Sequence, residues 1–269
     1  MKYPIFPTIT LAAASGLLVC SQVSAFTDNF NSYTTGNDIV TEPGTEWLNG
    51  TGGTTGGGVQ FEGNAEESPF SGIVGGKSAK LDDSSSSRGS GAGLKYFNSG
   101  SDEATIQFDY YFSEPALGFA GFSPNLIVGD AAATGASGLY LYLAREDGES
   151  STGYSIMSRE ISSFKPLAEV DEDTWYRVTV IASALTNKYD VRLQEFGGSE
   201  NVIGTNENFR VGASTLSEFS FIENNGNTGT GIYTIDNVSI IPEPGAYAAI
   251  FGLSALGLVL GRRRIVRRS

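Results

Sequence analysis

The stretch Asp173–Phe196, DTWYRVTVIASALTNKYDVRLQEF, contains two runs in which apolar and polar side chains alternate. The apolar positions of the first run are Tyr176, Val178 and Val180, and those of the second are Tyr189, Val191 and Leu193. A period of two is typical of β-strands that bury one face and leave the other in water. The stretch therefore predicts a hairpin of two half-buried strands.

The same period recurs along the chain. In residues 104–112 (ATIQFDYYF) one face carries Ile106, Phe108, Tyr110 and Phe112, and in residues 138–146 (GLYLYLARE) one face carries Leu139, Leu141 and Leu143. Further strands are predicted around 59–61, 79–81, 155–161, 218–222 and 232–240. Gly, Asn, Asp and Ser separate these runs, and no long helical pattern appears. About a dozen strands predict an all-β fold, a jelly-roll β-sandwich of two antiparallel sheets.

The order of these strands resembles the concanavalin-like and LamG-like jelly rolls. The resemblance rests on FTDNFNSY (26–33), on the Trp175–Tyr176 pair that opens the hairpin, and on YTIDNVSI (233–240). It implies that the first and last strands of the domain lie side by side.

The N-terminus has the pattern of a secretory signal peptide. Lys2 precedes a short apolar run, and Val23 and Ala25 occupy the −3 and −1 positions of a small-residue cleavage site. We expect a signal peptide over residues 1–25, with Phe26 as the first residue of the mature chain. The alternative interpretation, a lipoprotein signal that is cleaved before Cys20, fits less well, because Val19 stands where a small residue is expected.

The C-terminus has a second unusual segment. Residues 245–260 form a run of 16 uncharged residues, about 24 Å long as a helix and short for a membrane span. Five arginines follow it: Arg262, Arg263, Arg264, Arg267 and Arg268. Positive charge favours the cytoplasmic side, so the domain would lie outside. The alternative is a buried C-terminal helix, which the arginines and the lack of an amphipathic period disfavour.

Pro242, Glu243 and Pro244, the apolar run and Arg262 to Arg264 together resemble the PEP-CTERM sorting signal, here residues 242–269. The resemblance implies an exported protein of the cell surface or extracellular matrix. It also implies an exosortase-type membrane protease as a partner, and a membrane anchor through the C-terminal helix before processing. It carries no information on residues 26–241, which we expect to form the jelly-roll domain.

Charge and composition exclude several functions for residues 26–241. The chain has 17 basic and 30 acidic residues, and removing Lys2, Glu243 and the five C-terminal arginines leaves 11 and 29, a net charge of −18. That charge repels nucleic acids. The chain has no histidine, which excludes a Ser-His-Asp triad and histidine-bound zinc. The single cysteine, Cys20, lies in the expected leader, so the mature chain forms no internal disulfide.

The segment EVDEDTW (169–175) is the nearest match to a catalytic motif. Glu169 and Asp171 resemble the first two positions of the E-x-D-x-x-E or E-x-D-x-E motif of laminarinase-like glycosidases, where two carboxylates perform retaining hydrolysis. The third position would need Glu at 173 or 174, and those residues are Asp and Thr. The alternative interpretations are an acidic turn that leads into the Trp175 strand, which we favour, and a calcium site. We assign no catalytic residues.

Asp28 and Asp236 are the candidate ligands of a structural calcium ion. They lie on the first and last strands, which the jelly-roll resemblance places together. Calcium takes six to eight oxygen ligands, so two aspartates would supply only part of its shell. The alternative is that Asp236 caps or hydrogen-bonds a neighbouring turn.

Tyr111, Tyr140 and Tyr142 are the candidate ligand-binding residues. Tyr140 and Tyr142 share one face of their strand, and Tyr111 lies opposite the core face of its own. Flat aromatic rings stack on sugar rings, so a polysaccharide-binding platform is one hypothesis. Ordinary cross-strand pairs are the other. We expect a non-enzymatic, exported binding protein for polysaccharide or another matrix component. A structural matrix protein without a ligand, and a carboxylate-based glycoside hydrolase or lyase, are the alternatives.

Overall fold

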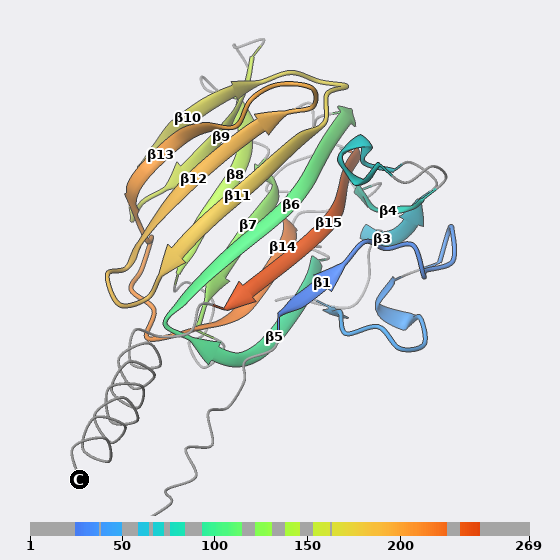
Figure 1. Ribbon diagram of the computed structural model, residues 1–269, viewed down its shortest axis with the longest axis horizontal. Coiled ribbons are helices and arrows are strands. Elements are labelled where there is room, and N and C mark those ends of the chain that lie inside the picture. Colours follow the sequence, from blue (N-terminus) through green and yellow to red (C-terminus); the bar gives the residue numbers. More distant parts are fainter. Residues whose placement is uncertain are drawn as a thin grey trace, which may run out of the picture.

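The computed structural model describes residues 25–37, 39–49, 59–64, 67–72, 76–83, 93–114, 122–130, 138–145, 153–161, 163–224 and 232–242. Two antiparallel sheets pack face to face, as the alternation predicted (Figure 1). The sheet nearer the reader in Figure 1 is called the front sheet. Its strands lie in the order β13 (Asn201–Asn208), β12 (Lys188–Glu195), β11 (Tyr176–Ser183), β6 (Glu103–Glu114), β15 (Ile232–Pro242), β4 (Ser78–Asp83) and β3 (Val59–Asn64). Strand β1 (Phe26–Asp28) lies outside this order and pairs with β15. The back sheet runs β10 (Phe164–Val170), β9 (Tyr154–Arg159), β8 (Leu139–Arg145), β7 (Phe122–Gly129), β14 (Leu216–Asn224), β5 (Gly93–Ser101), β2 (Leu48–Asn49). Two short 3-10 helices, η1 (Ile39–Thr41) and η2 (Pro69–Ser71), complete the described elements.

The predicted hairpin is confirmed. Strands β11 and β12 pair without interruption from Tyr176 opposite Glu195 to Ser183 opposite Lys188. Asn187 ends the connection with φ of 53°, a left-handed conformation that asparagine adopts more readily than most residues. The prediction that the first and last strands are neighbours is also confirmed, because Phe26 pairs with Ile240 and Asp28 with Val238.

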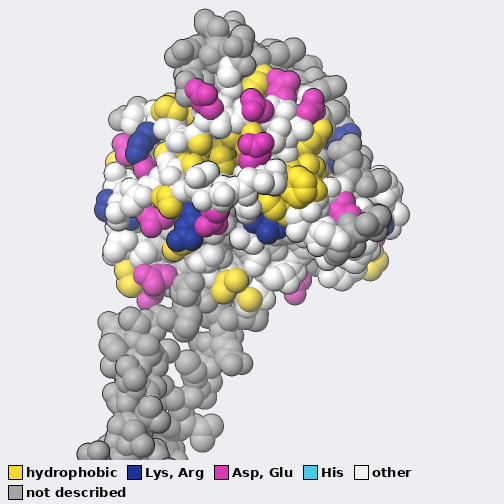
Figure 2. Space-filling model, turned by 45° about the horizontal axis from the view of Figure 1, so that its top comes forward, with side chains coloured by type: hydrophobic (Ala, Val, Ile, Leu, Met, Phe, Trp, Pro, Cys, Tyr) yellow, Lys and Arg dark blue, Asp and Glu magenta, His cyan; other side chains and the backbone are white. Residues whose placement is uncertain are grey.

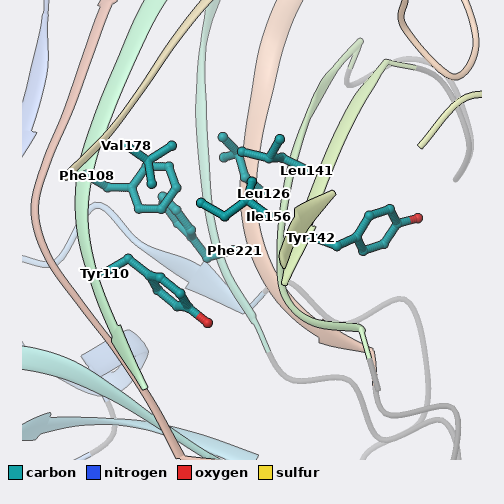
Figure 3. A pocket seen from close by; sticks show the side chains of 8 residues that line it. All are labelled: Phe108, Tyr110, Leu126, Leu141, Tyr142, Ile156, Val178 and Phe221. Atoms are coloured by element: carbon teal, nitrogen blue, oxygen red, sulfur yellow. The ribbon is translucent and has the colours of Figure 1, made fainter. Parts of the chain in front are cut away.

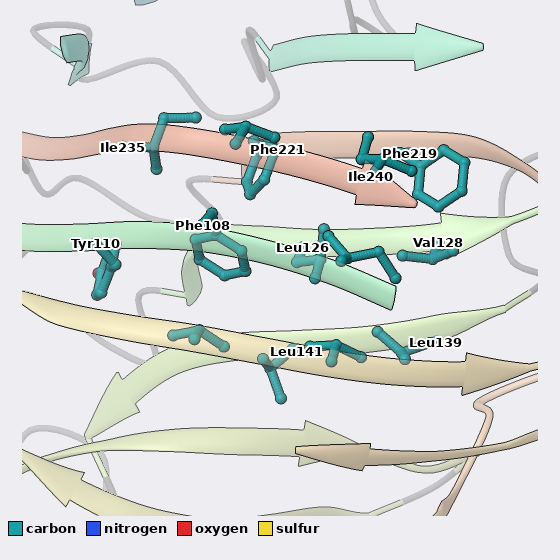
Figure 4. Packing of buried hydrophobic residues seen from close by; sticks show 14 of the residues in the cluster. Phe108, Tyr110, Leu126, Val128, Leu139, Leu141, Phe219, Phe221, Ile235 and Ile240 are labelled. Carbon is teal, nitrogen blue, oxygen red and sulfur yellow. The ribbon is translucent and has the colours of Figure 1, made fainter. Parts of the chain in front are cut away.

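The core lies between the two sheets. Figure 4 shows side chains of β6 and β15 facing side chains of β7, β8 and β14. Phe108, Ile235 and Ile240 come from the front sheet, and Leu126, Leu141, Phe219 and Phe221 come from the back sheet; all are buried. The predicted period of two describes most of both inner faces. In β15 it is interrupted by the register shift between Asp236 and Ser239, after which Val238 and Ile240 are the inward residues.

The segment before β2 packs onto one end of this core through Trp47. Its ring lies 5.0 Å from that of Phe26 and 5.9 Å from that of Phe30, and its Nε1 donates to Asp28 at 2.7 Å. Trp47 is only 1% exposed. Asp28 therefore joins β1 to the segment that leads into the back sheet.

Strands β2, β5, β7, β10 and β13 were not predicted. β10 contains Pro166 but is an edge strand, where a missing N–H costs no ladder bond, and its register shifts between Pro166 and Ala168. β13 is also an edge strand, and its sequence, NVIGTNEN, is mostly polar. Because β10 ends at Val170, the acidic turn that was predicted to begin at Glu169 begins at Asp171 instead.

Both predicted terminal signals fall largely outside the described residues. Ala25 is exposed, Phe26 is buried in β1, and Pro242 is the last residue of β15. Residues 1–24, Glu243, Pro244 and Arg262 to Arg264 lie outside the described ranges. Within those ranges, no helix has the length and apolar character needed to cross a membrane.

Candidate functional site

Tyr111 and Trp175 form a stacked pair on the outer face of the front sheet. Tyr110 and Phe112 are buried in the core, so the alternation of β6 directs Tyr111 outward. Its ring lies 5.2 Å from that of Trp175 with 29° between the planes. Asp173 accepts a hydrogen bond from the Tyr111 hydroxyl at 3.0 Å and donates its own N–H to Phe112 O at 2.9 Å. The acidic turn therefore holds the Tyr111 ring in place.

Two phenylalanines extend this pair. Phe196 directly follows β12 and donates its N–H to Trp175 O at 2.9 Å. Its side chain is 51% exposed and meets the Phe70 ring of η2 at 5.4 Å, nearly edge to face. We call Phe70, Tyr111, Trp175 and Phe196 the aromatic cluster. The aromatic cluster lies where β6 ends and β11 begins. Figure 2 turns that end of the molecule toward the reader, and hydrophobic side chains gather on its surface among acidic ones.

A buried ion pair lies beside the aromatic cluster. Arg177 Nε and Nη2 donate to the two carboxylate oxygens of Asp109 at 2.7 and 3.0 Å, and Arg177 Cζ is 4.6 Å from the centre of the Phe70 ring. Ser68 Oγ and Asn237 Nδ2 also donate to Asp109, each at 2.7 Å. Asp109 is fully buried and has four donors, so its negative charge is fully hydrogen-bonded. Arg177 in turn holds Phe70 against the sheet.

Asp236 is the second buried carboxylate of this region and pairs with Asp109 across β15 and β6. It accepts hydrogen bonds from the N–H groups of Ser68 at 3.0 Å and Asn237 at 2.7 Å. Burial, followed by the charges of Asp109 and Glu67, raises the pKa of Asp236 to about 7. Ser68 covers both aspartates, whose exposed fractions are 0 and 1%. Both side chains therefore lie beneath the outer surface.

The two predicted calcium ligands have different partners. Asp28 accepts hydrogen bonds from Phe30 N, the Tyr33 hydroxyl and Trp47 Nε1, each at 2.7 Å. It lines a polar hollow of about 410 Å³ together with Asn237, and Asp236 is absent from that lining. No group of three or more acidic side chains that could hold a metal occurs among the described residues. Calcium binding stays a prediction.

The three candidate tyrosines lie on two separate surfaces. Tyr140 and Tyr142 share the outer face of the back sheet, as predicted, and are 7 and 3% exposed. Arg159 lies 6.0 Å from each of their rings. Burial raises the pKa of Tyr142, against the lowering effect of the Arg159 hydrogen bond. Tyr111 is on the front sheet, so the structure does not bring the three together into one platform.

The laminarinase-like segment occupies the edge of the back sheet. Glu169 lies in β10 and Asp171 in the turn that follows, and both are exposed. Asp173 binds Tyr111, as described above. The acidic turn that leads to Trp175 is therefore confirmed for residues 171–175.

Sequence reasoning missed Phe70, Trp175 and Phe196 as members of a site, since it used Trp175 only for the jelly-roll resemblance. Phe196 could have been found, because the outward positions of β12, Arg192 and Gln194, continue to it with a period of two. Phe70 gives no such signal, because it reaches the sheet from η2, outside the strand pattern.

Between the described parts of the two sheets lies one small apolar cavity. A cavity of about 20 Å³ lies between the sheets, bordered by Phe108, Tyr110, Leu126, Leu141, Tyr142, Ile156, Val178 and Phe221. Figure 3 shows Tyr142 directed away from the others. A volume of this size holds one water molecule at most, and its lining is apolar.

No family model and no curated protein sequence matches this chain. Among solved structures it is similar to the cellulose induced protein Cip1, with a TM-score of 0.53 and 13% identity over 81% of this chain and 97% of that one. A sialidase gives a TM-score of 0.51 and 15% identity over 79% of this chain and 18% of the sialidase. Lectin II from Ulex europaeus gives 0.47 and 11% over 81% of this chain and 97% of the lectin. The chain thus has a jelly-roll β-sandwich fold, and it spans less than a fifth of the sialidase.

Proposed function

We propose that the protein is an exported, non-enzymatic polysaccharide-binding protein whose binding surface is the aromatic cluster. The observation that carries this proposal is the gathering of four aromatic rings from four segments at one place on the outside of the front sheet. Trp175, Tyr111 and Phe70 are partly exposed and Phe196 is half exposed. Clustered exposed aromatic side chains mark interaction sites on soluble proteins.

The chemistry of the aromatic cluster suits sugars. Pyranose rings present flat C–H faces that stack on aromatic rings, while their hydroxyl groups need hydrogen-bonding partners at the rim. Asp171, Glu172 and Asp173 in the adjoining turn are exposed and supply acceptors. The similarity to a sialidase and to a cellulose induced protein is in keeping with a carbohydrate ligand.

The absence of catalysis is part of the proposal. The chain has no histidine, and the paired aspartates 109 and 236 lie beneath the surface, where a sugar does not reach them. A glycoside hydrolase or lyase would need carboxylates that converge in one open groove. A structural matrix protein is the second candidate, and it would show no measurable affinity for glycans.

The aromatic cluster predicts a large effect of one substitution on binding. Trp175→Ala should weaken binding by about 30-fold or more, because removing an aromatic side chain from the centre of a binding surface costs about 2 kcal/mol or more. The measurement is a glycan array on the wild type, followed by affinity electrophoresis in gels that contain the neutral polymers that bind.

Phe97→Ala is the matched control for Trp175→Ala, because Phe97 is a 39% exposed aromatic residue of the back sheet. Equal affinities of the wild type and Trp175→Ala would reject the aromatic cluster. A wild type that binds no glycan on the array would favour the structural matrix protein.

We further propose that residues 242–269 are a PEP-CTERM sorting signal that an exosortase-type protease processes after export. The support is the order of Pro242–Pro244, the uncharged run and the arginines. The intact mass of the secreted protein should correspond to a chain that begins at Phe26 and ends near Pro244. A mass that still includes Ser269 would mean a permanent membrane anchor.

A further inference from the structure

Two guanidinium groups lie against the tyrosines of β8 on the outer face of the back sheet. Arg210 Cζ is 5.0 Å from the centre of the Tyr140 ring, and Arg159 Cζ is 6.0 Å from the same centre. Arg159 Nη1 also donates a hydrogen bond to the Tyr142 hydroxyl at 2.8 Å. We call Tyr140, Tyr142, Arg159, Phe164 and Arg210 the arginine face. It lies on the opposite sheet from the aromatic cluster.

Among the residues that the structure describes, neither Arg159 nor Arg210 has a carboxylate partner. In the part of the chain that the structure describes, salt bridges are made by Lys95, Lys165, Arg177 and Arg192, and none by Arg159 or Arg210. Nearby acidic groups bind elsewhere, since Glu160 accepts from Ser163 and Asn208 and Glu207 pairs with Lys165. Lys77 and Lys188 also make no salt bridge among the described residues, but their ammonium groups donate to Tyr33 O and to Asn206 O and Asn208 Oδ1. Arg159 and Arg210 differ from them in lying against aromatic rings.

The backbone fixes both arginines in place. Arg210 N donates to Gly138 O at 2.9 Å, and Gly138 N donates to Val211 O at 2.8 Å, so two hydrogen bonds join the Arg210 segment to the start of β8. Arg159 ends β9 and pairs with Phe164 of β10. The backbones of both arginines are thus fixed, and the ring contacts with Tyr140 and the hydrogen bond to Tyr142 restrict the guanidinium groups, which lowers the entropic cost of binding.

The two guanidinium groups repel each other and are only partly buried. A guanidinium group carries five N–H donors in a planar fork that matches carboxylate and sulfate groups, and on Arg159 the Tyr142 hydroxyl takes one of them. Phe164 is 43% exposed, and its ring centre lies 5.3 Å from Arg159 Cζ. An anionic group and a flat apolar surface are therefore accommodated side by side.

We infer that the arginine face binds an acidic polysaccharide, with the anionic group of one sugar residue accepting hydrogen bonds from Arg159 and Arg210 and its ring against Phe164. The inference takes from the proposed function only that the ligand is a polysaccharide, and it does not use the aromatic cluster. It also accounts for the burial of Tyr140 and Tyr142, whose role is to support the two cations.

The test measures binding of the full mature chain to polygalacturonate, dextran sulfate and unmodified dextran by affinity electrophoresis. The wild type should bind polygalacturonate, and the double variant Arg159→Gln, Arg210→Gln should bind it at least about tenfold more weakly, because it lacks both charge-assisted contacts. Dextran sulfate decides whether a sulfate ester is also accepted. Competition by sodium acetate decides whether a free carboxylate suffices without its sugar.

Arg192→Gln is the matched control, because it removes one positive charge from a 42% exposed side chain on the front sheet. It should bind polygalacturonate as the wild type does, and Arg210→Gln alone serves if the double variant unfolds at a lower temperature. Equal losses in Arg192→Gln and the double variant would mean non-specific charge attraction and overturn the site. A wild type that binds neither acidic polymer would overturn it as well. Loss of binding in Trp175→Ala instead would assign the acidic ligand to the aromatic cluster.

Discussion

Replacing Asp109 by alanine should lower the free energy of unfolding by about 3–5 kcal/mol, the range for breaking a buried ion pair by removing one partner. The carboxylate is fully buried, and its loss would leave the Arg177 guanidinium, 24% exposed, without its bidentate partner. Ser68 Oγ and Asn237 Nδ2 would each lose an acceptor as well. Urea unfolding followed by tryptophan fluorescence gives the free energy.

The exposed pair Arg192–Glu200 provides the matched control for Asp109→Ala. Its atoms are 3.2 Å apart and both side chains are 42% exposed, so Glu200→Ala should cost less than about 1 kcal/mol. Changing Asp109 and Arg177 together to leucine should cost less than Asp109→Ala alone, because no unpaired charge remains. A loss for Asp109→Ala no larger than that for Glu200→Ala would show that water reaches Arg177 freely.

Gly138→Ala should destabilise the protein by about 3 kcal/mol or more, from backbone strain and overpacking together. Gly138 has φ of 122°, which side chains rarely adopt, and an added Cβ would lie 1.8 Å from Val128 O. The obstacle is backbone of the adjacent strand β7, so it cannot rotate away. Because Arg210 N is hydrogen-bonded to Gly138 O, the Gly138→Ala variant should also bind polygalacturonate more weakly at the arginine face.

Gly197→Ala separates the two contributions. Gly197 also has a positive φ, 80°, but no atom lies within 4 Å of its added Cβ. The Gly197→Ala variant should therefore lose only the free energy that backbone strain costs, about 1–2 kcal/mol. The comparison uses thermal and urea unfolding of both variants. Equal losses at the two positions would mean that β7 and β8 separate enough to accept the methyl group.

Alternation of side chains was enough to predict the sandwich, since strands that are half buried show a period of two. It predicted β11, β12 and β15 well, because these lie inside the front sheet or beside its centre. It failed at β5 and β7, which lie inside the back sheet but contain the Gly, Pro, Asn and Ser residues typical of turns. It also failed at β10 and β13, which are edge strands and have one neighbour each. An edge strand buries less surface, so its sequence is under weaker constraint to alternate.

Alternation also failed to show which outer faces are covered. It correctly directed Asp109 away from the core, yet Asp109 is fully buried because Ser68, from a segment 41 positions earlier, closes over it. Tyr140 and Tyr142 likewise face outward but are covered. Alternation in the sequence indicates on which side of a sheet a residue lies. Whether another segment lies on that side depends on contacts far apart in the sequence.

The position of β15 has a mechanical consequence. Its last residues pair with β6 on one side, up to Pro242 opposite Ala104, and with β1 on the other. Hydrogen bonds between strands run perpendicular to the strands, so a pull on the chain beyond Pro242 acts along β15 and loads many bonds at once in shear. A domain tethered at that point would resist the drag of flowing fluid, because its bonds would have to break together rather than one after another.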